Sequence, residues 1–93
     1  MELSLGERKV RIKFNPSNDD IIYKIKAKHA ELINLINELD LESCPGELPE
    51  RIIENKHITD TGLRGDFYIY KGYAIKKIEE SSMWAVKAAT VKL

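Results

Sequence analysis

Residues 73–90 read YAIKKIEESSMWAVKAAT, a run without glycine or proline that predicts one unbroken helix. Helical spacing gathers small side chains on one face of this helix: Ser81, Ser82, Ala85, Ala88 and Ala89. Small side chains let the backbone of a neighbouring helix come close. The run therefore predicts a helix that packs tightly against a second helix.

A second long helix is predicted over residues 18–39. Its apolar side chains recur at spacings near three and four: Ile22, Ile25, Leu32, Ile33, Ile36 and Leu39. Ser17 or Asn18 is a suitable N-cap, and the two aspartates that follow favour a helix N-terminus through the helix dipole. This helix is the natural packing partner of the first.

Before it, residues 8–14 predict a short β-strand. Val10, Ile12 and Phe14 alternate with basic residues, which is the period-two pattern of a strand with one buried face. The sequence Asn-Pro-Ser-Asn at residues 15–18 is typical of a turn and ends the strand.

The two helices are joined by a long connection. Prolines and a glycine within residues 44–49 break the helical pattern, and residues 49–54 predict a short turn of helix. Residues 57–65, rich in threonine and glycine, predict a loop. Asp66 then caps the last helix, predicted over residues 67–92.

These elements predict a mainly α fold in one domain, residues 1–93. Its architecture is an antiparallel helical hairpin with a short N-terminal β-strand and a long connecting loop. A lone hairpin leaves apolar surface on its outer faces, and the strand has no partner within the chain. We therefore expect a homo-oligomer.

Charge is unevenly distributed, although the formal net charge is zero. Residues 8–28 contain seven lysines or arginines and two aspartates, whereas residues 31–60 contain eight acidic and two basic residues. A local basic segment suits a small anionic ligand better than a long nucleic acid, which usually needs a broad basic face. The alternative, that these charges are ordinary solvated faces, stays open.

The sequence also bears on the cellular compartment. Cys44 is the one cysteine, so no internal disulfide forms and nothing indicates secretion. No signal peptide begins the chain, and no apolar stretch has the length of a membrane span. We expect a soluble cytosolic protein that does not enter a membrane.

No pattern of residues predicts catalysis. The sequence has neither a nucleophile elbow nor a glycine-rich phosphate loop. His29, His57 and Cys44 share no metal-ligand spacing, and the two pairs of adjacent carboxylates project from different helix faces. We expect no enzyme activity, no cofactor and no metal site.

Ligand binding is the better-supported hypothesis. Phe14 offers an aromatic face for a nucleobase and Asn15 an amide for a base edge, while Lys26 and Lys28 supply ammonium groups for phosphates, with Arg11 nearby.

In the predicted loop, Thr61 and Arg64 offer a hydroxyl and a guanidinium to a phosphate. The alternatives are that Phe14 is a core residue and that the lysines simply face solvent.

Three segments, taken in order, resemble a known family: Phe14-Asn15, the helical sequence IKAKHAELINLI, and the closing helix AIKKIEESSMWAVKAAT. Together they are similar to the helical-hairpin domain shared by phage anti-defence sponges, and most similar to the anti-CBASS cyclic-oligonucleotide sponges of tailed phages. The resemblance covers residues 13–39 and 72–90, roughly half of the chain.

The resemblance implies a protein in the cytoplasm of an infected bacterium that sequesters cyclic dinucleotides such as cyclic GMP-AMP, and in some members cyclic trinucleotides, without hydrolysing them. It implies a homohexamer arranged as a trimer of dimers, with ligand pockets between protomers. The base-stacking position falls on Phe14, the neighbouring polar contact on Asn15 and the phosphate contact on Lys26, with Lys28 close to a further contact. A small helical adaptor that grips a host protein is the alternative function.

Overall fold

The computed structural model describes residues 2–15, 19–47 and 61–93, and of Thr61 only the backbone. In chain order its helices are α1 (Leu5–Lys9), α2 (Asp20–Asn37), the 3₁₀ helix η1 (Leu41–Ser43) and α3 (Thr61–Ala89). The described residues are mainly helical, as predicted, and include no β-strand. The helical turn predicted at residues 49–54 and the loop predicted at 57–60 lie outside them.

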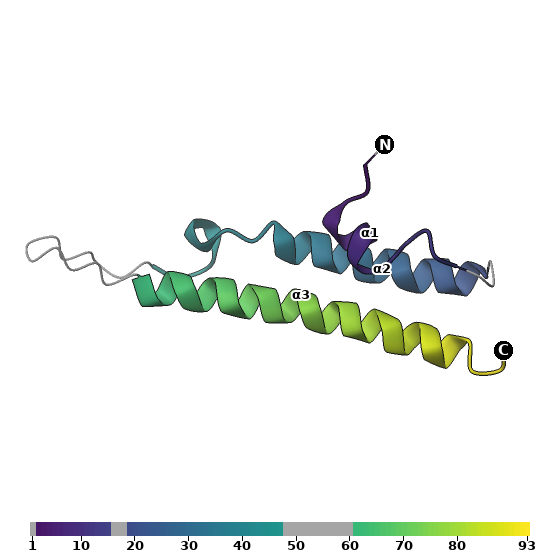
Figure 1. The fold of residues 1–93 in the computed structure, drawn as a ribbon. Coiled ribbons are helices and arrows are strands. Elements are labelled where there is room, and N and C mark those ends of the chain that lie inside the picture. The colour runs from purple at the N-terminus through teal and green to yellow at the C-terminus, as the bar shows by residue number, and fades with distance from the viewer. Residues whose placement is uncertain (1, 16–18, 48–60) are drawn as a thin grey trace, which may run out of the picture.

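The two long helices, α2 and α3, lie side by side and run in opposite directions, and α1 lies across α2 (Figure 1). The N-terminal half of α3 extends past the end of α2 (Figure 1). The described part of the chain is accordingly elongated, since α3 alone, with 29 residues, is about 43 Å long. This arrangement brings the N-terminal segment beside the C-terminal half of α3.

A small core forms where these three elements meet. Its buried apolar side chains are Val10, Ile12, Ala30 and Ile33, against which Ile75 and Ile78 of α3 pack. The small face of α3 is divided: Ser82 is buried and Ala85 half-buried, whereas Ser81, Ala88 and Ala89 are exposed. The small face of α3 is thus only partly covered within this chain.

The prediction of a β-strand at residues 8–14 is wrong. A capping box starts α1 instead, in which the Ser4 hydroxyl accepts a 3.1 Å hydrogen bond from the Glu7 backbone N–H and the Glu7 carboxylate accepts one of 2.8 Å from the Ser4 N–H. The hydrogen bond from the Ser4 N–H is the main cause that holds the pKa of the Glu7 carboxyl below its usual value, and the Ser4 side chain lowers it further.

After α1, residues 10–13 form turns whose backbone N–H groups bond back to α1, for example Ile12 N–H to Glu7 C=O at 3.0 Å. Val10 and Ile12 are buried, as the alternation predicted, while Phe14 is exposed. Successive turns therefore bury Val10 and Ile12 with the same period of two that a pleated strand would show.

The short α1 is held on α2 by unusually close backbone contact. A Cβ atom at Gly6 would lie 2.1 Å from the Ala30 carbonyl oxygen, so only glycine allows this approach. The Gly6 N–H donates a 2.7 Å hydrogen bond to the Asn34 side-chain oxygen, and the Asn34 amide donates to the Ser4 hydroxyl at 3.0 Å. Asn34 of α2 thus binds both the N-cap residue Ser4 and the first turn of α1 at Gly6.

The last helix begins earlier than predicted: α3 starts at Thr61, whereas the sequence predicted a start at residue 67. The loop predicted at residues 61–65 and the N-cap role of Asp66 are therefore wrong. Contacts to the chain after α2 stabilise this first part of α3: Arg64 pairs with Glu42 at 3.0 Å, and the Lys71 ammonium donates to the Leu39 carbonyl at 3.0 Å. They offset the weak helix propensity of the glycines in this stretch.

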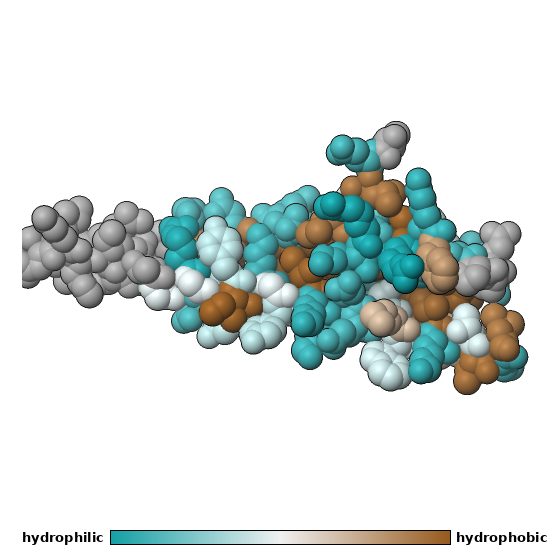
Figure 2. Space-filling view, in the orientation of Figure 1, coloured by the Kyte–Doolittle hydropathy of each residue, from teal (hydrophilic) through white to brown (hydrophobic). Residues whose placement is uncertain are grey.

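Many large apolar side chains of α3 remain exposed: Leu63, Tyr68, Ile69, Tyr70, Tyr73, Met83 and Trp84. Figure 2 shows apolar surface near the C-terminal end of α3 and a smaller patch on its N-terminal half. Within the residues that the structure describes, no helix has both the length and the apolar character that crossing a bilayer requires.

Candidate functional site

Two adjoining grooves lie between the N-terminal segment and the C-terminal half of α3. The first groove has a volume of about 730 Å³ and the second about 400 Å³, and both are lined by Phe14, Lys26 and Val86. Volumes in this range are typical of small-molecule sites. Since the two grooves share three residues, we treat them as one candidate site.

The aromatic side chain of Phe14 stands at the junction of the grooves. It is 54% exposed, so an incoming ring can reach it. The Arg11 guanidinium lies over its ring at 4.7 Å from the centroid, within cation–π range. Asn15 lines the second groove, and its amide donates a 3.0 Å hydrogen bond to the Asp19 carbonyl.

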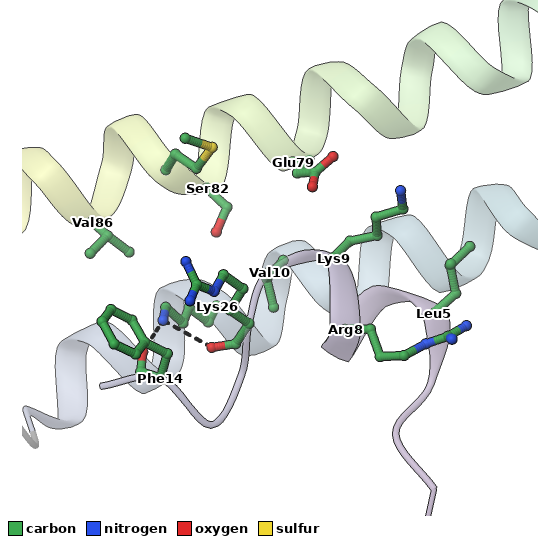
Figure 3. Close-up of a pocket in the computed structure, with 11 residues that line it drawn as sticks. Leu5, Arg8, Lys9, Val10, Phe14, Lys26, Glu79, Ser82 and Val86 are labelled. Atoms are coloured by element: carbon green, nitrogen blue, oxygen red, sulfur yellow. Dashed lines mark hydrogen bonds between the residues drawn. The ribbon is translucent and has the colours of Figure 1, made fainter. Parts of the chain in front are cut away.

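Lys26 is buried beneath this segment, with only 5% of its surface exposed. Its ammonium donates hydrogen bonds to the backbone carbonyls of Arg11, at 3.0 Å, and of Phe14 (Figure 3). Burial lowers the pKa of Lys26 below the usual value for lysine, and the Arg11 charge lowers it further. The predicted phosphate-binding lysine is therefore also part of the support for the turn that carries Phe14.

The buried position of Lys26 has a signal in the sequence, which is its spacing from the apolar residues of α2. The buried residues of α2 are Ile22, Lys26, Ala30 and Ile33, at spacings of four, four and three. Lys26 thus occupies a place in the apolar stripe rather than on the solvent face. Leu32 and Leu39, which were assigned to that stripe, are exposed.

The structure brings together four of the predicted ligand-binding residues, Arg11, Phe14, Asn15 and Lys26, around the two grooves. Lys28 is not among the lining residues. It projects from α2 with its side chain exposed and forms an ion pair of 3.6 Å with Glu31.

Arg64 and Thr61 lie at the other end of α3. Arg64 is about 22 Å along the helix axis from Glu79, which lines the first groove. It pairs with Glu42, and Thr61 is the first residue of the helix. The structure therefore does not place these two residues beside Phe14.

Sequence reasoning missed several residues of the first groove. Arg8 and Lys9 of α1 add positive charge to it, and α3 contributes Glu79, Ser82 and Met83 (Figure 3). Folding residues 5–9 as a helix is what brings these basic side chains to the groove. The S-x-x-E pattern at residues 4–7 was the available signal for that helix.

Elsewhere, a third groove of about 310 Å³ lies on α1 and α2 and is lined by Ser4, Glu7, Ile12, Tyr23, Ala27, Ala30, Glu31 and Asn34. Over the described parts of the chain, no group of three or more His, Cys, Asp or Glu side chains is arranged to hold a metal ion.

Comparison with protein-family models, with curated proteins and with solved structures finds no match for this chain.

Proposed function

We propose that this protein binds cyclic dinucleotides without cleaving them, and so acts as a sponge that removes the signal of a bacterial anti-phage defence system of the CBASS type. The observation that carries the proposal is the exposed Phe14 ring at the junction of two grooves, with the Arg11 guanidinium over the ring and the basic residues Arg8 and Lys9 further along the first groove. Aromatic stacking together with positive charge is the usual means of binding unpaired bases and their phosphates.

In this proposal the Phe14 ring stacks on a base, and the Asn15 amide contacts a base edge. Each stacked base contributes on the order of 1–3 kcal/mol. The basic residues of the first groove balance the charge of the phosphodiester groups. Cyclic trinucleotides are candidate ligands as well, because the same stacking and charge contacts recognise them.

We further propose that the active form is a homo-oligomer, a hexamer built as a trimer of dimers, in the cytoplasm of the infected cell. The exposed apolar side chains of α3, Trp84 among them, support self-association, because such surface is usually covered by a partner. A cyclic dinucleotide has near-twofold symmetry. A symmetric interface offers Phe14 twice, once from each protomer, to match it.

A thermal-shift assay with a panel of cyclic dinucleotides, cyclic GMP-AMP included, tests the function. Ligand at about a hundredfold its Kd is expected to add about 2.7 kcal/mol of stability. Phe14→Ala is expected to lose this stabilisation. Tyr23→Ala, which removes an exposed aromatic ring of α2 that lines neither of the two grooves, is the matched control and is expected to keep it. If no cyclic nucleotide stabilises the wild-type protein, the proposal is wrong.

A protein–protein adaptor is the second candidate, and the exposed Tyr70, Tyr73 and Trp84 of α3 favour it. An adaptor would keep its partner when Phe14→Ala is introduced. It would lose the partner with Ala85→Leu, which overfills the small part of the α3 face. The sponge predicts the reverse: ligand binding is more sensitive to Phe14→Ala than to Ala85→Leu.

A further inference from the structure

The turn that carries Phe14 is held from beneath by a single side chain. The Lys26 ammonium donates to the Arg11 carbonyl at 3.0 Å and to the Phe14 carbonyl (Figure 3). The Phe14 N–H closes the same turn with a 2.9 Å hydrogen bond to the Arg11 carbonyl. Two of the three N–H groups of Lys26 are therefore committed to the backbone of this turn.

The backbone at Arg11 is itself unusual. Among the described residues, Arg11 is the one residue other than glycine with a positive φ, at 56°. This left-handed region is disfavoured for residues with a Cβ atom. Its effect here is to turn the chain so that the guanidinium lies over the Phe14 ring while the carbonyl points down to Lys26.

Of the two cations, Arg11 is the accessible one. Its side chain is exposed and lines the first groove, whereas Lys26 is buried and its ammonium is engaged by carbonyl oxygens. A guanidinium stays charged at any physiological pH and presents several N–H donors in a plane that matches a phosphate. Stacking on Phe14 keeps this plane in place beside the surface available to a base.

We propose that Arg11 supplies the charge that contacts a ligand phosphodiester, and that Lys26 is a positioning residue that holds the Arg11–Phe14 turn in its binding conformation. The inference rests on the proposed function for the identity of the ligand. It assigns different roles to Arg11 and Lys26, two neighbouring cations that residue type alone would both make phosphate-binding residues.

The test measures the affinity for cyclic GMP-AMP by calorimetry at several salt concentrations, with the ligand-free melting temperature recorded for each variant. Arg11→Asn suits the left-handed backbone and removes the charge. It is expected to keep or raise the melting temperature, to weaken binding roughly tenfold or more, and to reduce the dependence of affinity on salt.

Lys26→Met keeps the length of the side chain and removes its donors. It is expected to lower the ligand-free melting temperature, to speed hydrogen exchange at the Phe14 amide, and to weaken binding while leaving the salt dependence close to that of the wild type. Lys13→Gln is the control, because it removes one exposed charge from the same segment at a position that lines neither groove. It is expected to bind as the wild type does.

The inference is overturned if Lys26→Met keeps the melting temperature and the Phe14 protection, and loses salt dependence as a phosphate contact would. It is also overturned if Arg11→Asn binds with unchanged affinity. A wild-type protein that binds no cyclic dinucleotide would refute the proposed function and the ligand role of Arg11. In that case the ligand-free measurements on Lys26→Met still decide the positioning role.

Discussion

The Lys26 ammonium is charged in a place that water scarcely reaches, and two carbonyl oxygens take the place of its hydration. Carbonyl dipoles compensate such a charge only in part, and the neighbouring Arg11 opposes it. Burial of the charge therefore offsets part of the stability that the hydrogen bonds of Lys26 to the turn contribute at neutral pH. The left-handed backbone of Arg11 adds a further cost of about 1–2 kcal/mol.

This balance predicts a specific pH dependence. The pKa of Lys26 in the folded protein lies below its ordinary value of 10.5, so between the two values the unfolded chain binds more protons than the folded one. Stability from this group therefore rises with pH through that window and is flat well below it. Compared with Lys26→Met, the wild type is expected to gain stability as the pH approaches about 10.5.

Urea denaturation of both proteins, in steps from about pH 7 to pH 10.5, measures this difference directly. Subtracting the Lys26→Met curve removes the contributions of the tyrosines and the other lysines. A difference that stays constant, or that shrinks as the pH rises, would show that burial does not disfavour the Lys26 charge.

At the scale of elements, the docking of α1 on α2 depends on backbone contact that no flexible side chain can relax. Gly6→Ala would place its Cβ atom 2.1 Å from the Ala30 carbonyl oxygen and 2.8 Å from the Ala30 Cα atom. The helix has to move away, so we expect a loss of about 1–3 kcal/mol in the free energy of unfolding. The loss is measured by thermal or urea denaturation.

Gly72→Ala is the matched control for this substitution, because a Cβ atom there meets nothing within 4 Å. In the interior of a helix it is expected to stabilise the protein by up to about 1 kcal/mol. Equal effects of the two substitutions would mean that α1 does not pack on α2 as closely as the structure has it. Loss of α1 docking is also expected to weaken ligand binding, since α1 carries Arg8 and Lys9 to the first groove.

The long helices were predictable and α1 was not, for a reason of length. Over α2 and the core of α3, apolar and small side chains repeat through many turns, so periodicity identifies them with little ambiguity. Five residues of α1 are too few to show a period. The neighbouring alternation of Val10 and Ile12 then dominated, although the capping-box pattern of Ser4 and Glu7 was present in the sequence.

In the candidate site too, some residues were identifiable from the sequence pattern, whereas others depend on contacts formed only in the folded chain. Phe14 and Asn15 were identifiable from residue type and position beside a turn. The burial of Lys26 followed from its spacing to Ile22 and Ala30, but a lysine is so rarely buried that residue type outweighed spacing. The start of α3 at Thr61 depends on contacts with the chain after α2, which local propensity does not include.

At the scale of the whole molecule, the chain is too extended to bury its own apolar surface. The radius of gyration is 18.3 Å, against roughly 12 Å for a compact domain of this length. Of the five buried apolar side chains among the described residues, four form one cluster, and α3 is left with a series of exposed aromatic side chains. Self-association would bury this exposed apolar surface without a longer chain.

Trp84 makes this proposal directly measurable. It is the single tryptophan of the chain and is 66% exposed in the isolated protomer, with the Lys87 ammonium 5.2 Å from its ring centroid. If α3 faces a second copy, the fluorescence emission of Trp84 is expected to shift to the blue as protein concentration rises, in step with the mass found by sedimentation.

Trp84→Glu is expected to raise the dissociation constant of self-association by roughly thirtyfold or more, as the loss of an aromatic anchor does. Lys92→Glu, which adds the same carboxylate beyond the end of α3, is the control and is expected to assemble normally. Emission that stays typical of exposed indole at every concentration, together with a monomer mass, would refute the assembly.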